Sequence, residues 1–228
     1  MNAATGENSH AEGHNTTAAG LSAHSEGEGL GYTTLSSAAT AGSNTFTVNN
    51  LNNFEVGRYV VLNNETKKIT AIDSSTMTVT VDSNFEKYTP EGAFVYLSGA
   101  IGDYSHSEGY KTLATGDYSH AEGSNTEATN SGAHTEGIKT IAKGYSSHAE
   151  GGIYGASSSK PEGWIHTLTA SDYPTFLTED VTIYGSIANG NNSHAEGGGT
   201  YAHGEGSHAE GNFTLAMNYG SHSEGYGT

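Results

Sequence analysis

The chain contains no cysteine, three prolines and one tryptophan in 228 residues. Without cysteine no disulfide can stabilise the fold, and the cellular compartment cannot be deduced from cysteine usage. Lysine and arginine number 8 together, against 25 aspartates and glutamates, which gives a formal net charge of −17. Nucleic acid is therefore not expected as a ligand, because phosphate binding depends on clustered basic side chains.

Long apolar stretches are also missing. No run approaches the roughly 20 residues that a membrane helix needs, and residues 1–5 are polar. We therefore expect neither membrane insertion nor an export signal. Hydrophobic residues make up only 33% of the chain, whereas glycine alone numbers 32, so an aliphatic core cannot account for most of the fold.

The sequence does contain a repeat. The pattern Ser/Ala-His-small-Glu-Gly occurs nine times, and within each uninterrupted run the histidines lie 14 residues apart. Between copies lies a looser unit of seven residues, Thr/Ser-x-Ala-x-Gly-x-x, as in 112–118 and 140–146. A fixed short period of this kind is typical of a solenoid rather than of a globular domain.

Each half-repeat predicts one short strand followed by one turn. Ser, Ala and Thr alternate with the x residues, so the small side chains share one strand face and should fill the interior of the coil. Glycine suits the turn because it tolerates positive φ, and we expect Asn130 and Asn218 to adopt the left-handed conformation where glycine is absent. Nine coils of 14 residues would stack into one rod. Because such small side chains bury little apolar area, a single rod is expected to be marginally stable and to need a partner.

The repeats and two insertions account for almost the whole chain. We predict roll coils at 1–29, 98–153 and 186–228, an inserted β-barrel at 30–97 and an aromatic-rich excursion at 154–185. Both insertions interrupt the repeat at the same point, so both should leave the roll at the same corner. The excursion and the barrel are expected to project away from the face that carries the histidines.

The outward-facing positions differ between the two half-repeats. In the looser unit they vary, as in Leu113 and Thr115 or Tyr201 and His203, a mixture that we expect to face solvent. In the other unit they are always His and Glu, and nine identical pairs suggest nine identical environments along a symmetry axis. The predicted axial ladder comprises His10, Glu12, His24, Glu26, His106, Glu108, His120, Glu122, His134, Glu136, His148, Glu150, His194, Glu196, His208, Glu210, His222 and Glu224.

These paired half-repeats resemble the head repeats of trimeric autotransporter adhesins. The resemblance covers the repeat residues and implies a left-handed parallel β-roll that assembles as a homotrimer. The chain departs from that family at the axial positions, which are usually aliphatic there and are His and Glu here. The fold class expected overall is all-β, a trimeric parallel β-roll of nine coils that carries an antiparallel β-barrel and a second short β-rich insertion.

The first insertion changes composition. Five alternating β-branched and aromatic runs, 45–48, 59–62, 68–72, 77–81 and 94–97, are separated by turn signals and predict a small antiparallel barrel. The stretch 54–62 followed by 68–72 also resembles small β-barrel modules of phage tail proteins.

The second insertion holds the only tryptophan and several other aromatic residues. Two interpretations are open: the rings stack on sugar rings at a bacterial surface, or they pin the excursion onto the roll. The candidate ligand-contacting residues are Trp164, Tyr173, Phe176 and Tyr184.

The His/Glu positions suggest a structural ladder. We expect alternating layers of His and Glu, with each imidazole hydrogen-bonded to a carboxylate of a neighbouring chain. If such a pair is ionic, assembly lowers the Glu pKa and raises the His pKa. An ion held by His rings on a three-fold axis is an alternative, although no metal residue is assigned and no cofactor is expected. Catalysis is not expected, because catalytic sites are single and asymmetric whereas this pattern is repeated nine times.

The leading hypothesis is a non-enzymatic trimeric fibre segment of a phage or prophage tail, located in the virion, that binds a glycan or protein receptor on a bacterial host. The alternative is the head of a bacterial trimeric adhesin at the cell surface. A glycan-cleaving tailspike is a third possibility, but it would need a paired-carboxylate cleft that the sequence does not locate.

Overall fold

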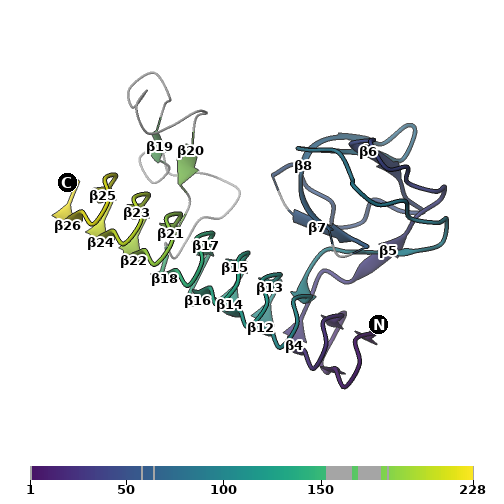
Figure 1. Ribbon diagram of the computed structural model, residues 1–228, viewed down its shortest axis with the longest axis horizontal. Helices are drawn as coiled ribbons and strands as arrows, with labels where there is room; N and C mark the ends of the chain where they lie inside the picture. Colours follow the sequence, from purple (N-terminus) through teal and green to yellow (C-terminus); the bar gives the residue numbers. More distant parts are fainter. Residues whose placement is uncertain are drawn as a thin grey trace.

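The computed structural model describes residues 2–57, 59–63, 65–152, 166–168, 181–183 and 185–227. The described residues are all-β and contain no helix, so none is available there to span a membrane. The chain forms a parallel β-solenoid from which a separate antiparallel sheet branches near the N-terminus (Figure 1). The predicted fold class is confirmed at this level.

Two nine-stranded parallel sheets build the roll. The looser half-repeats form the variable sheet: β1 (Ala3–Ala4), β3 (Thr17–Ala18), β11 (Gly99–Ala100), β13 (Leu113–Ala114), β15 (Glu127–Ala128), β17 (Ile141–Ala142), β21 (Ile187–Ala188), β23 (Tyr201–Ala202) and β25 (Leu215–Ala216). The other half-repeats form the His/Glu sheet: β2 (His10–Ala11), β4 (His24–Glu28), β12 (His106–Tyr110), β14 (His120–Ser124), β16 (His134–Thr135), β18 (His148–Gly151), β22 (His194–Gly198), β24 (His208–Asn212) and β26 (His222–Tyr226).

The coils stack in strict register. In β12 and β14, His106 pairs with His120 and Glu108 with Glu122. The two insertions do not disturb this order, because β4 pairs directly with β12 and β18 directly with β22. Equivalent residues of successive coils therefore lie above one another along the whole roll.

Small side chains fill the interior, as predicted. One continuous cluster of buried alanines runs from Ala114 to Ala216, and Thr126, Thr140 and Thr200 are fully buried beside it. Where a serine precedes the ladder histidine, as it does in every coil except those of His24 and His134, its hydroxyl donates to a carbonyl of the preceding turn. Ser147 Oγ, for example, lies 2.7 Å from the Gly144 carbonyl oxygen.

The turn glycines fall into two classes. The glycine that follows each ladder glutamate has positive φ, such as +102° at Gly123, and an added Cβ there would lie 2.2 Å from the Gly137 carbonyl oxygen. The glycine of the looser unit does not have positive φ. It is needed because the turns of successive coils approach closely there: a Cβ on Gly190 would lie 2.2 Å from the Gly204 carbonyl oxygen. The left-handed conformation predicted for Asn130 and Asn218 is therefore wrong, because they occupy this second class.

The insertion at the N-terminal end is an antiparallel sheet of six strands. These are β5 (Tyr32–Thr34), β6 (Thr45–Thr47), β7 (Tyr59–Leu62), β8 (Glu65–Asp73), β9 (Thr78–Val81) and β10 (Phe94–Tyr96), in the spatial order β5-β10-β7-β8-β9-β6. A bridge between Leu35 and Val48 links the ends of the two outer strands. The five predicted strands are present, and β5 was not predicted.

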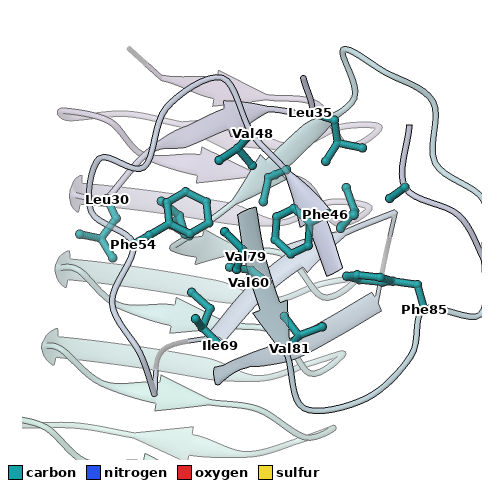
Figure 2. Packing of buried hydrophobic residues seen from close by; sticks show 14 residues of the cluster. Leu30, Leu35, Phe46, Val48, Phe54, Val60, Ile69, Val79, Val81 and Phe85 are labelled. Carbon is teal, nitrogen blue, oxygen red and sulfur yellow. The ribbon is translucent and has the colours of Figure 1, made fainter. Parts of the chain in front are cut away.

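The inserted sheet has its own aliphatic and aromatic core. Phe46, Val60, Val79 and Phe85 pack together inside it (Figure 2). Burial of large apolar side chains stabilises this unit by about 1.5–3 kcal/mol for each. Among the described residues, the interior of the roll has no comparable cluster of large side chains, because alanine methyl groups fill it.

The inserted sheet packs on the outer face of the variable sheet. Val61 of β7 contacts a cluster with Ile101 and Leu113, and Tyr59 and Tyr96 pack against the same cluster. Figure 1 places β7 and β8 on the side of the roll that carries the variable sheet, and the paired strands β19 (His166–Leu168) and β20 (Val181–Ile183) lie on that side too.

The expectation that the variable positions face solvent is wrong at several coils. Leu113 is 3% exposed because the inserted sheet covers it, and Ile187 and Tyr201 are 4% and 2% exposed. The outer face of the variable sheet is therefore partly buried, at Leu113 by the inserted sheet.

Two glycine substitutions test the stacking. In Gly211→Ala the new Cβ would lie 2.1 Å from the Gly225 carbonyl oxygen at a φ of +112°, so we expect a loss of about 3 kcal/mol or more. In Gly206→Ala, φ is +64° and nothing lies within 4 Å, so only the left-handed penalty of about 1–2 kcal/mol applies. Urea unfolding measures both, and equal losses would contradict close backbone approach as the role of Gly211.

Candidate functional site

The outer face of the His/Glu sheet carries a ladder of imidazole rings. From His24 to His222 successive rings stack with centroids 4.7–4.9 Å apart and planes within 8° of parallel. Only the first pair differs, because His10 meets His24 edge-on at 85°. The spacing follows directly from the strand separation of about 4.8 Å in a parallel sheet.

A column of glutamates runs beside the histidines. Within a coil, His106 Nε2 lies 3.5 Å from a Glu108 carboxylate oxygen, and the two side chains are 34% and 37% exposed. The same pairing recurs at 3.6 Å for His120 with Glu122 and at 3.7 Å for His148 with Glu150. These contacts are within one chain, and they are long for a hydrogen bond.

The predicted alternation of His and Glu layers is wrong for the roll itself. Like stacks on like along the axis, because a parallel register with a fixed period places each residue above its own equivalent. The two residue types instead form adjacent columns. A protonated imidazole would therefore lie next to two other imidazoles. An ionised carboxylate would likewise lie next to two other carboxylates.

The imidazole nitrogens that face the glutamates are not satisfied within one chain. Six Nε2 atoms are shielded from solvent yet have no hydrogen-bond partner among the described residues, those of His106, His120, His134, His148, His194 and His208. A shielded polar atom without a partner costs about 1–3 kcal/mol. The face is therefore incomplete as it stands in the single chain.

The ladder shifts its own titration. Burial, followed by the neighbouring imidazoles, holds the pKa of His120 and His148 below the ordinary value, and His194 is shifted in the same direction for the same reasons. Burial also raises the pKa of Glu150, with further contributions from Glu136 and Glu196. These directions are opposite to those expected for ionic pairs, so the ionic prediction applies only to contacts between copies of the chain.

The ladder brings together groups that could in principle ligate a metal. In each of several sets, such as His106, Glu108 and His120, one ligand atom per residue lies within 4.8 Å of the others. The parallel rings, however, direct their lone pairs in parallel rather than towards one point, whereas a bound zinc ion requires nitrogens that converge at about 2.0–2.1 Å. Two stacked imidazoles of one chain would therefore have to turn towards each other before they could share an ion.

The predicted aromatic contacts Trp164, Tyr173, Phe176 and Tyr184 lie outside the described residues. A second feature was missed from the sequence: a cleft of about 320 Å³ between the roll and the inserted sheet, lined by Asn15, Leu30, Gly31, Tyr32, Asn50, Asn52 and Asn53. The run Asn49-Asn50-Leu51-Asn52-Asn53 was a visible signal. That this run lines a cleft could not be predicted, because the cleft also needs Asn15 of the roll, which is distant in the sequence.

The sequence was compared with protein-family models and with curated proteins, and neither comparison gave a match.

The pKa shifts predict a pH dependence of stability. Because the folded pKa of His120, His148 and His194 lies below the unfolded value, the unfolded chain takes up protons first as pH falls below about 6.5. The free energy of unfolding should therefore fall from about pH 8 to pH 5.5. Glu150 acts with the opposite sign, since its raised pKa favours the folded state towards about pH 4.5.

Urea unfolding of the protein as isolated, at one fixed protein concentration across the pH range, checks this expectation. Replacing His120, His148 and His194 by Asn should flatten the profile. An unchanged slope in the triple variant would contradict the assignment of the pH dependence to these rings.

Proposed function

We propose that this chain is a segment of a non-enzymatic homotrimeric fibre, belonging to a phage or prophage tail, that attaches the virion to a bacterial surface. In this proposal the roll is the shaft, the His/Glu face is the contact between copies, and the inserted segments provide the attachment surfaces. Repeats that resemble adhesin heads and an insertion that resembles phage tail modules both support it.

The single observation that carries the proposal is the uninterrupted His/Glu ladder. It presents the same pair of side chains in every coil, about one-third exposed at His106 and Glu108. Six of its Nε2 atoms lack a hydrogen bond among the described residues of the single chain. A partner with the same axial repeat would match every pair at once, and another copy of the chain has that repeat. Association would complete these hydrogen bonds either by shortening the Nε2–carboxylate distances within each chain or by placing a carboxylate of a neighbouring chain next to each Nε2.

The position of the inserted sheet fits this assembly. It packs on the variable sheet through Val61, Ile101 and Leu113, on the opposite side of the coil from the ladder. The His/Glu face therefore stays open for association, and the insertion would point outward from the shaft. A weakly packed alanine interior gives a further reason for association, because the roll buries little apolar area by itself.

The oligomer prediction concerns the ladder directly. Sedimentation equilibrium should give a trimer without a folded monomer at micromolar concentration. His120→Ala removes one partner of the His120–Glu122 pair in every chain, a pair that the proposed assembly buries, so it should destabilise the assembly by about 3–5 kcal/mol per pair. Replacing His120 by Val and Glu122 by Ile together should be neutral or stabilising, because no uncompensated polar group is left.

His14→Ala is the matched control, since His14 is exposed and lies outside the ladder. Its melting temperature should stay close to that of the parent. Equal melting temperatures for His120→Ala and the parent would show that the ladder faces solvent in the assembly.

Excision of residues 154–185 tests the attachment role. Because β17 pairs with β21 and β18 with β22, joining Ile153 to Ser186 should keep the coils in register and preserve the trimer. Binding to host cells, measured with labelled protein, should weaken. If the excised protein binds cells as well as the parent does, the excursion belongs to the scaffold.

A further inference from the structure

The cleft between the roll and the inserted sheet is formed by three separate segments. Asn15 comes from the turn between β2 and β3 of the roll, 30–32 from the point where the chain leaves the roll, and 50–53 from the loop between β6 and β7. The cleft therefore exists only because the insertion folds back on the coil that precedes it.

The loop of the cleft is held in place by its own contacts. Asn53 Nδ2 donates to the Leu30 carbonyl at 3.0 Å, and the Asn52 backbone N–H donates to Asn50 Oδ1 at 3.2 Å. Phe54, which follows, is anchored in the core of the inserted sheet. A site held this way loses little conformational entropy when a ligand binds.

Several polar atoms of the cleft are left over for a ligand. The Asn52 side-chain amide, Asn50 Nδ2 and Asn53 Oδ1 make no hydrogen bond within the described part of the chain. All three side chains are exposed. Together they offer donors and acceptors within a span of four residues.

The chemistry of the lining restricts the ligand class. The lining residues are four asparagines, a tyrosine, a leucine and a glycine, with no charged side chain, on a protein of net charge −17. An anion would find no cationic group and a cation no carboxylate. Amide groups are both donors and acceptors, as the vicinal hydroxyls of a sugar require.

Tyr32 supplies the apolar component. Its ring packs edge-on against Phe94 at 4.9 Å, which fixes its orientation on β5. An aromatic ring beside amide groups suits a pyranose, whose faces are apolar and whose rim is polar. A volume of about 320 Å³ lies at the small end of ligand sites and suits one or two sugar rings.

We propose that this asparagine-lined cleft is a carbohydrate-binding site for a neutral mono- or disaccharide unit of a surface glycan. The inference rests on the proposed attachment function and names the ligand class and the residues for it. It places a receptor contact at the junction of the inserted sheet and the roll, separate from the excursion at 154–185.

Saturation-transfer NMR with the 228-residue chain tests the site, using glucose, galactose, rhamnose and N-acetylglucosamine as probes. At least one sugar should bind the parent. Asn52→Ala should weaken that binding about tenfold through loss of amide hydrogen bonds, and Asn52→Trp should abolish it by filling the cleft. Asn84→Ala and Asn84→Trp are matched controls, because Asn84 is an exposed asparagine of the same insertion outside the cleft.

Failure of the parent to bind any of the four sugars, or equal binding by Asn52→Trp and the parent, overturns the assignment. Cell attachment is measured in parallel so that the two proposals fail separately. Sugar binding that depends on Asn52, in a protein that does not attach to cells, supports the site and contradicts the attachment function. Attachment without any sugar binding contradicts the site and leaves the attachment function standing.

Discussion

The roll depends on the close approach of one backbone turn to the next. At each coil a glycine lies so near the following turn that even a methyl group would collide with a carbonyl oxygen, as at Gly109 against Gly123. Because these glycines lack a Cβ, successive turns approach closely, and every coil repeats the position of its predecessor. The two insertions are tolerated because each leaves and rejoins the roll without disturbing that contact.

Strict register has an electrostatic consequence. It stacks imidazole on imidazole and carboxylate on carboxylate, an arrangement in which like charges repel at about 4.8 Å. The chain responds by favouring neutral forms, with a lowered pKa at His120 and a raised pKa at Glu150. Six imidazole Nε2 atoms on this face lack a hydrogen-bond partner among the described residues, and the proposed association of identical chains would supply partners to all of them.

The two parts of the molecule achieve stability by different means. The inserted sheet buries Phe46, Val60 and Phe85 in a core of large side chains, whereas the roll relies on backbone hydrogen bonds and an alanine interior. Their junction combines the two, because the outer residues Ile101 and Leu113 of the roll pack against Val61. The same junction forms the asparagine-lined cleft, which neither part would have alone.

The sequence alone determined the period, the inward-facing Ala and Thr, and the strands of the insertion apart from β5, because local alternation and turn residues encode these features directly. It could not distinguish a glycine needed for positive φ from one needed for close approach, so the conformation of Asn130 and Asn218 was predicted wrongly. Only the tertiary structure decided that Leu113 and Tyr201 are covered and that Asn15 and Asn52 line one cleft. Each of these depends on which distant segments come together, and a local pattern carries no information about its partner across space.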